Sequence, residues 1–490
     1  MNTGARLDRQ IEQDIKDLHR LGYAQELYRS IGGFSNFAIT FSVISVLSGL
    51  MTLYGYGLNL VGPFTIWTWG VVGFFQLLLA LALGEISSIY PLAGGVYKWT
   101  RRLSNPHVGW FCGYFSLLGW LACTAGIEFG LGVFLASYLG FDPSNIRIVL
   151  WITIIIVFLH SLINIFGIRI VAWFNDLSVN IHIIGVAVLA GLLLIFGQRN
   201  SLSSVFDTGN LPPGTMILNF TQALLMSAWT LTAFDAAANV SEESINPSKV
   251  VPWGMVFAVL ASLLLGSLLL LSLNLALPDL NETLNSGTPA ALYVIRSALG
   301  PTIYKFVTAI ILLAQFTAGL SSQTVLVRIL YSFSRDGGIP LSQAWKYVSP
   351  KYDTPVYSVF LATGATVLLI LFAAFLPAIT SLSTVGIYFS YAITLGAAIL
   401  NRQKIRTQRG PFHLGRFGTV VQTVSLVWAL FITAIMVVPP IGKIGRIFVI
   451  TVVIAIVYYV LVMRKSLNFE YRRLSSWELE QIESMRAPKS

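Results

Sequence analysis

The chain has 490 residues, of which 55% are hydrophobic and only 11% are charged, and its formal net charge is +10. A soluble protein would carry about 25% charged residues. The composition therefore excludes an ordinary soluble domain and indicates a protein embedded in a lipid bilayer.

Apolar runs long enough to cross a bilayer follow one another along the whole chain. A spanning helix needs about 20 residues, and the chain offers twelve such runs. We therefore predict an all-α polytopic membrane protein with twelve transmembrane helices. The runs fall roughly at 34–60, 64–90, 108–137, 148–168, 171–197, 216–243, 252–277, 302–330, 355–376, 380–400, 418–439 and 444–463.

The positive charges are distributed unevenly between the two sides of these helices. If the N-terminus is cytoplasmic, all but six of the 31 Lys and Arg fall in cytoplasmic segments, and the loop 402–416 alone carries five. This bias predicts that both termini are cytoplasmic. We expect a multi-pass protein of the plasma membrane. It also explains the net charge without a nucleic-acid partner. Binding of anionic lipid by these loops is a secondary possibility.

The predicted organisation is a cytoplasmic tail at 1–33, a transmembrane domain at 34–465 and a second cytoplasmic tail at 466–490. We expect the first tail to be amphipathic or irregular. The chain contains no Gly-rich phosphate loop ending in Lys-Ser or Lys-Thr. Any transport must therefore use a gradient or exchange rather than ATP, and we expect no cofactor.

The sixth run is interrupted. Its apolar part from Ile217 to Trp229 is too short to span a bilayer, and polar residues follow before Asp235. The first run also gathers small residues at its centre, from Ser42 to Gly49. Two interrupted helices five segments apart indicate an inverted-repeat transporter with its site at the middle of the bilayer. The alternative is that the small residues only allow close helix packing.

Three motifs in order resemble the amino acid–polyamine–organocation (APC) transporter superfamily. The first is LALGEISSIYPLAGGVYKW (81–99), the second is AFDAAANVSEESINPSKVVP (233–252), and the third combines YSFSRDGGIP (331–340) with TPVYS (354–358). The opening of the first run is similar to the amino acid/choline branch, which includes GABA permeases. The resemblance implies a 5+5 inverted repeat, with repeats at about 34–197 and 216–400, broken helices 1 and 6, and two peripheral helices at 418–463.

The resemblance places substrate at the two breaks. In the first helix the family's Gly-x-Gly element, whose amides hold a carboxylate, aligns with Leu47, Ser48 and Gly49, so Leu47 replaces the first glycine. This replacement hinders the approach of a carboxylate to the backbone. The hydroxyl of Ser45 is expected to assist.

In the sixth helix, the carbonyls of Trp229, Thr230 and Leu231 would receive the substrate amine, because unpaired carbonyls in a dry cavity favour a cation. The ring of Trp229 would suit an ammonium group by cation–π attraction, and its alternative role is a gate or packing aromatic. We expect Phe234 to form a gate wall. We expect Asp235 to be structural, accepting hydrogen bonds at the break.

His182 aligns with a position where several family members carry a lysine that replaces a sodium ion. Histidine changes charge near neutral pH, so we expect His182 to brace the first helix and to couple a proton to transport. A packing histidine and sodium coupling through Ser and Thr oxygens are the alternatives. Glu128 is expected to line the site and to neutralise a cationic substrate or carry a proton, unless it lies in the outer vestibule. His160 is expected to be structural.

The predicted function is secondary active transport of a small amino-type solute, such as an amino acid or GABA, by alternating access and with proton coupling. The alternatives are a choline, ethanolamine or polyamine transporter, an exchanger, and a nutrient sensor that keeps the transporter fold. A membrane enzyme is not expected, because no nucleophile–base motif or His-rich cluster is present. The sequence does not indicate an oligomeric state.

Overall fold

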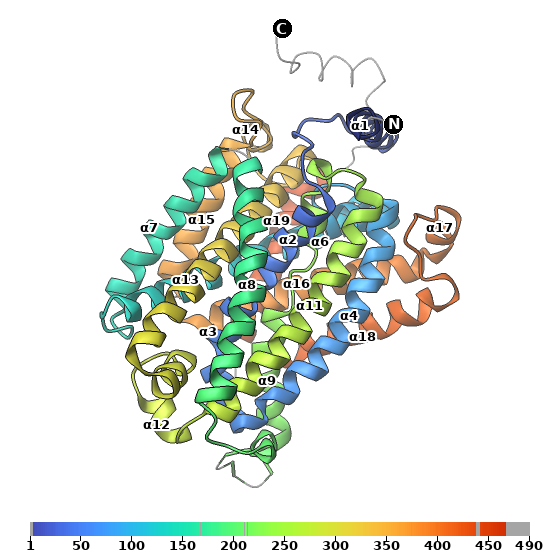
Figure 1. Ribbon diagram of the computed structural model, residues 1–490. Helices are drawn as coiled ribbons and strands as arrows, with labels where there is room; N and C mark the ends of the chain where they lie inside the picture. Colours follow the sequence, from blue (N-terminus) through green and yellow to red (C-terminus); the bar gives the residue numbers. More distant parts are fainter. Residues whose placement is uncertain are drawn as a thin grey trace.

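The computed structural model of the protein describes residues 3–166, 168–209, 211–212, 214–373, 375–437 and 442–466. Within these ranges the regular elements are all helices, accompanied by two isolated β-bridges, Ile31–Ser244 and Ser349–Thr354. The helices form one bundle with most axes roughly aligned (Figure 1). The predicted all-α class is confirmed. The predicted C-terminal tail lies outside the described residues, apart from Ser466.

The first half of the chain begins with a helix outside the bundle and continues with four apolar helical stretches, of which the first is broken. The bounds are α1 Thr3–Arg20, α2 Gly33–Ile44, η1 Val46–Leu50, α3 Met51–Val61, η2 Gly62–Thr65, α4 Ile66–Ile89, α5 Gly95–Leu103, α6 Pro106–Tyr138, α7 Ile146–Ile165 and α8 Ile168–Phe196.

The second half begins with another broken helix and ends in the two helices predicted to be peripheral. The bounds are η3 Leu202–Phe206, α9 Met216–Thr230, α10 Ala236–Asn239, η4 Ser241–Glu243, α11 Pro247–Ala276, α12 Leu280–Asn285, α13 Ala290–Arg335, α14 Ser342–Trp345, α15 Val356–Ala373, α16 Leu376–Leu400, α17 Arg402–Thr407, η5 Gly415–Phe417, α18 Gly418–Val437, α19 Gly442–Tyr458, η6 Tyr459–Met463 and α20 Arg464–Ser466.

Among the described residues, nine helical stretches are long and apolar enough to cross a membrane. The first of them, Gly33–Ile89, contains two predicted spans, and Val356–Phe372 is a shorter apolar helix. Helix α9 has 15 residues and does not span alone. A multi-pass membrane protein is therefore clear, while the count of twelve spans remains a prediction.

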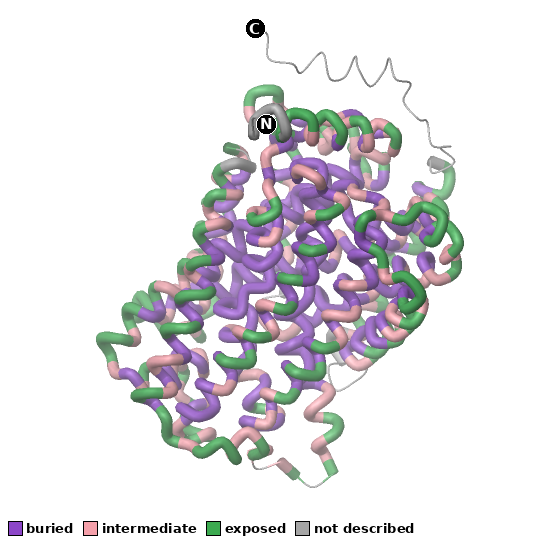
Figure 2. Tube along the Cα trace, turned by 45° about the vertical axis from the view of Figure 1, so that its right-hand side comes forward, coloured by how far each residue is buried: buried purple, intermediate pink, exposed green. Residues whose placement is uncertain are grey.

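Buried residues fill the middle of the bundle (Figure 2), and most residues of helix α6 are buried. It begins sharply because Asn105 caps it, accepting hydrogen bonds from the amides of His107 and Val108 at 3.0 Å each. It contacts α16 backbone to backbone, since a Cβ added at Gly119 would lie 2.6 Å from the amide nitrogen of Ile387. Small residues thus bring α6 close to its neighbours and fix its register.

The N-terminal segment is tied to the chain that follows the second break. Helix α1 is amphipathic, as expected for this tail, and lies at one end of the bundle (Figure 1). After it, the amides of Ser30 and Ile31 donate to the carbonyl of Glu243 at 2.9 and 2.8 Å. The guanidinium of Arg29 donates to the carbonyls of Ser241 and Ser244. These bonds fasten the start of the chain to η4.

Candidate functional site

The first break begins at Ser45, between α2 and the π-helical turn η1. Ser45 has φ 3° and ψ 98°, which interrupts the helix two residues before the predicted Leu47. Its side chain accepts a hydrogen bond from the amide of Ser48 at 3.0 Å, and its carbonyl accepts from Gly49 at 2.9 Å. The amides predicted to hold a carboxylate are therefore bonded to Ser45 in this conformation.

His182 of α8 braces this break. Its Nε2 lies 2.5 Å from the hydroxyl of Ser45, and its Nδ1 lies 2.8 Å from the carbonyl of Ser178. Because a carbonyl only accepts, Nδ1 carries a hydrogen and donates to Ser178. The hydroxyl of Ser178 in turn contacts Thr317 of α13 at 2.7 Å. The imidazole thus links the first break to α8 and α13, at full burial.

The second break separates α9 from α10, at the position predicted. The carbonyl of Leu231 accepts from Gln76 of α4 at 2.9 Å. The carbonyls of Trp229 and Thr230 accept no hydrogen bond from any described residue, because the chain turns away after them. The turn requires φ +63° at Ala233, a conformation that alanine rarely adopts. Two acceptors are therefore left open.

The residues directly after the second break are held by α6 and α16. Asp235 accepts a hydrogen bond from the hydroxyl of Tyr391 at 2.6 Å and from the indole of Trp120 at 3.4 Å. The ring of Phe234 lies 5.2 Å from that of Tyr391. These contacts agree with the structural role expected for Asp235 and place Phe234 against α16.

The two breaks touch each other. A Cβ added at Gly49 would lie 2.7 Å from the hydroxyl of Thr230, so the glycine is needed for this approach. Between the breaks lies a cavity with an empty volume of about 240 Å³, of which only about 10 Å³ admits the centre of a water-sized sphere. It holds about one water molecule and must widen to admit a solute. Its lining is Val43, Ile44, Ser48, Gly49, Cys123, Ile127, Trp229, Thr230, Thr232 and Ala233.

Five of the nine residues predicted to bind substrate do not line this cavity, namely Ser45, Leu47, Glu128, Leu231 and Phe234. Leu47 faces α8, where its side chain would contact a Cβ added at Gly185. Glu128 pairs with His160 of α7 at 2.6 Å, and both side chains are fully buried. A Cβ added at Gly319 of α13 would lie 2.9 Å from the Glu128 carboxylate. The carboxylate is thus enclosed between α6, α7 and α13, and the cavity is lined instead by Ile127 and Cys123 of the same helix.

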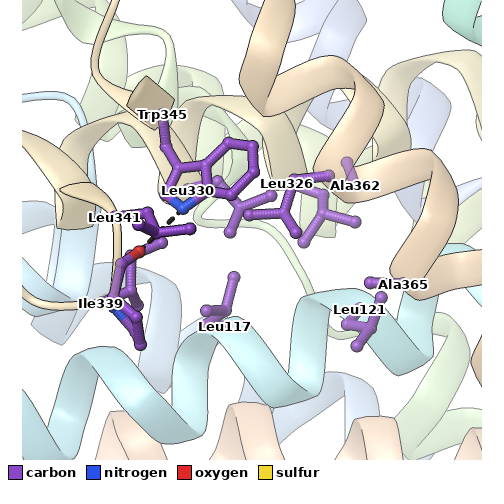
Figure 3. A pocket seen from close by; sticks show the side chains of 11 residues that line it. Leu117, Leu121, Leu326, Leu330, Ile339, Leu341, Trp345, Ala362 and Ala365 are labelled. Carbon is purple, nitrogen blue, oxygen red and sulfur yellow. Dashed lines mark hydrogen bonds between the residues drawn. The ribbon is translucent and has the colours of Figure 1, made fainter. Parts of the chain in front are cut away.

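An apolar hollow lies away from the breaks. It measures about 350 Å³ and lies between α6, α13, α14 and α15, where leucine side chains converge with Ile339 and Trp345 (Figure 3). Its one polar side-chain group, the indole of Trp345, already donates to the carbonyl of Pro340 at 2.8 Å. It therefore offers no group to bind an amine or a carboxylate.

A charged cluster closes the end of the bundle beside η4. Glu242 accepts from Arg335 at 2.6 Å, and Glu243 accepts from Arg328 at 2.8 Å. Both partners come from α13. Burial opposes ionisation of Glu242, but the charge of Arg335 outweighs it and lowers the pKa of Glu242.

Sequence reasoning missed a second part of this cluster. Asp336 lies 2.5 Å from Lys98 and 2.6 Å from Arg101, and the hydroxyl of Tyr97 donates to it. Burial would raise the pKa of Asp336, but the charges of Lys98 and Arg101 hold it well below its usual range. Two motifs carried the available signal, since residues 81–99 contain Tyr97 and Lys98 and residues 331–340 contain Asp336. Neither motif indicates that these residues pair with each other.

Comparisons with known proteins identify the family to which the chain is similar. The model of the family described as amino acid permease matches residues 31–462. The chain is 33% identical to Amino-acid permease BAT1 of Arabidopsis thaliana, covering 86% of this chain and 88% of that protein. It is 28% identical to the GABA-specific permease of Saccharomyces cerevisiae, with 87% and 78% covered, and 25% identical to the choline transporter of the same yeast, with 97% and 90% covered.

Proposed function

Because the chain belongs to the amino acid permease family of the APC superfamily, and so to transporters rather than enzymes, we propose that it moves an amino acid or GABA-like solute across the plasma membrane by alternating access. The observation that carries the proposal is the contact of two broken helices around a small closed cavity. We further propose twelve spans, a 5+5 inverted repeat and cytoplasmic termini, on the strength of the apolar runs and the distribution of Lys and Arg.

The second break supplies the site for the amine. The open carbonyls of Trp229 and Thr230 would accept hydrogen bonds from an ammonium group once the cavity widens. The indole N–H of Trp229 has no partner among the described residues, so it is available to an anionic group. A substrate carboxylate would bind the amides of Ser48 and Gly49 only by displacing Ser45. The first break is therefore the part of the site that must rearrange.

The hydrogen bonds of His182 support the proposal of proton coupling. When the imidazole is neutral, Nε2 accepts from the Ser45 hydroxyl, which itself accepts from the Ser48 amide. When Nε2 gains a proton, it must donate to the Ser45 oxygen, and the hydroxyl hydrogen must turn elsewhere. Protonation would thus change the bonding of the first break directly.

Choline and related ammonium compounds form the second candidate class. The cavity contains an aromatic face at Trp229 and carbonyl acceptors, both of which suit a cation that lacks a carboxylate. The likeness to a yeast choline transporter supports the same reading. Binding of such a cation would not require the Ser48 and Gly49 amides.

Uptake into proteoliposomes tests these proposals. Radiolabelled amino acids, GABA, choline, ethanolamine and polyamines would be offered with and without an inward proton gradient. Accumulation that collapses with a protonophore supports proton coupling. Counterflow without gradient-driven accumulation would instead indicate an exchanger, and binding without uptake would indicate a sensor.

A further inference from the structure

A basic hollow lies at the end of α4, far from the two breaks in sequence and structure. It measures about 290 Å³ and is formed by α17, the loop after it and the start of η5. Four of its eight lining residues are arginines. The lining is Glu85, Arg402, Ile405, Arg406, Arg409, His413, Gly415 and Arg416.

The loop that carries these side chains is anchored rather than free. The ring of Phe412 is 8% exposed and lies 5.1 Å from the ring of Trp253. The amide of Phe412 donates to the Ser88 hydroxyl at 3.0 Å, and the amide of Leu414 donates to Glu85 at 3.1 Å. Such anchoring fixes the spacing of the arginines before any ligand arrives, which lowers the entropic cost of binding.

The hollow carries more positive charge than its own residues neutralise. Glu85 is bonded to Arg402. Within the part of the chain that the structure describes, Arg406, Arg409 and Arg416 form no ion pair. Guanidinium groups bind oxygen anions with paired hydrogen bonds. The surplus therefore suits a multiply oxygenated anion, above all a phosphate.

Exposed apolar side chains lie next to the basic hollow. Trp253 and Phe257 of α11 are 49% and 50% exposed, and Phe417 and Val420 at the start of α18 are 59% and 61% exposed. Aromatic residues gather where a membrane protein meets the lipid headgroups. We propose that the hollow binds the phosphate of an anionic phospholipid, whose acyl chains lie on this surface of α11 and α18. A free phosphate has the same charged oxygens as the headgroup but no acyl chains to contact the apolar surface.

The test compares two double variants of the full-length purified protein. Arg406→Gln with Arg409→Gln removes two charges from the hollow and spares Arg402, which holds Glu85. Lys346→Gln with Lys351→Gln removes the same charge beside α14 and serves as the matched control. Binding of phosphatidylglycerol against phosphatidylcholine would be measured by native mass spectrometry. Thermal stabilisation by inorganic phosphate forms a separate arm.

We expect the arginine variant to lose about thirtyfold in affinity for phosphatidylglycerol, at roughly tenfold per 1.4 kcal/mol and about 1 kcal/mol per charge, while the lysine variant binds as the wild type does. Equal losses in both variants would overturn the site. In the thermal arm, phosphatidylglycerol is measured beside inorganic phosphate, and equal stabilisation by the two would overturn the lipid assignment. Unchanged melting temperatures without lipid confirm that both variants fold. Because the experiment measures lipid binding and not transport, its result can be interpreted even if the proposed transport activity is not found.

Discussion

The two helix breaks touch each other, but the backbone groups that they expose are hydrogen-bonded in different ways. The first is closed by its own chain and by α8, because Ser45 binds the amides of Ser48 and Gly49 and His182 binds Ser45. The second is held by Asp235, which follows it, yet no described residue donates a hydrogen bond to the carbonyls of Trp229 and Thr230. One break is braced by a titratable group, and the other presents open acceptors.

This difference separates two tasks that a coupled transporter must perform. Open acceptors in a dry cavity attract a cationic group, because an unpaired polar group is costly to bury. We propose that the bond between Ser45 and the imidazole of His182 makes the shape of the first break respond to pH. We therefore expect changes at the anchors of the second break to alter stability, changes in the cavity between the breaks to alter binding, and changes at His182 to alter coupling.

The largest effect is expected at Glu242, which follows the second break and pairs with Arg335 at the end of the bundle. Glu242→Gln would leave Arg335 buried without its carboxylate and should lower the free energy of unfolding by about 3–5 kcal/mol. The pKa of Glu242 is lower in the folded than in the unfolded chain. The unfolded chain thus binds more protons as the pH falls below the ordinary glutamate range, and stability falls with it.

Thermal melts of the wild type and of this variant across acidic pH would measure both effects. The variant should lack the part of the acid-dependent loss that comes from Glu242. Equal pH slopes in the two proteins would contradict the assignment. Glu282→Gln is a suitable control, because Glu282 lies in the exposed helix α12.

The next effect concerns the anchor of the second break. Asp235→Ala would leave the hydroxyl of Tyr391 and the indole N–H of Trp120 without their acceptor. It should lower the free energy of unfolding by about 3 kcal/mol. Ligand affinity at a temperature well below melting should change little. Asp235→Asn, which keeps an acceptor, should lose less stability. A large drop in affinity with unchanged melting would show that Asp235 binds the substrate directly.

A bulky side chain between the breaks should cost less stability but remove binding. Gly49→Val would push against Thr230, at an expected cost of about 1–3 kcal/mol, and would fill the cavity. Ligand-induced thermal shifts would report the loss. Gly70→Val in α4 is the matched control, since nothing lies within 4 Å of a Cβ there. Intact affinity in the Gly49 variant would refute the site.

The smallest effect on stability, and the most specific effect on function, is expected at the first break. His182→Gln should abolish pH-dependent accumulation in proteoliposomes while substrate binding persists. Ser178→Ala keeps the backbone carbonyl that holds Nδ1 and should retain the pH response. If His182→Gln transports with the wild-type pH profile, the coupling role is wrong.

Local sequence was enough to find the breaks but not their partners. A short apolar run before Thr230 and small residues around Ser48 predicted both interruptions. The break at Ser45 instead of Leu47 depends on a bond to α8, which no local pattern reports. Likewise, Glu128 was placed on the right helix but on the wrong side of it, because its pairing with His160 is decided by tertiary packing. Leu47 turned away for the same reason.

The bonds between Ile31 and the turn at Glu243 and Ser244 also have a consequence for biosynthesis. The N-terminal segment leaves the ribosome first, but its partner exists only after half of the chain has been made. Until then the extended segment around Arg29 lacks its final contacts. The first break also enters the membrane before the second. Assembly of this end of the bundle is therefore a late event in synthesis, and fusion partners placed directly before α2 would interfere with it.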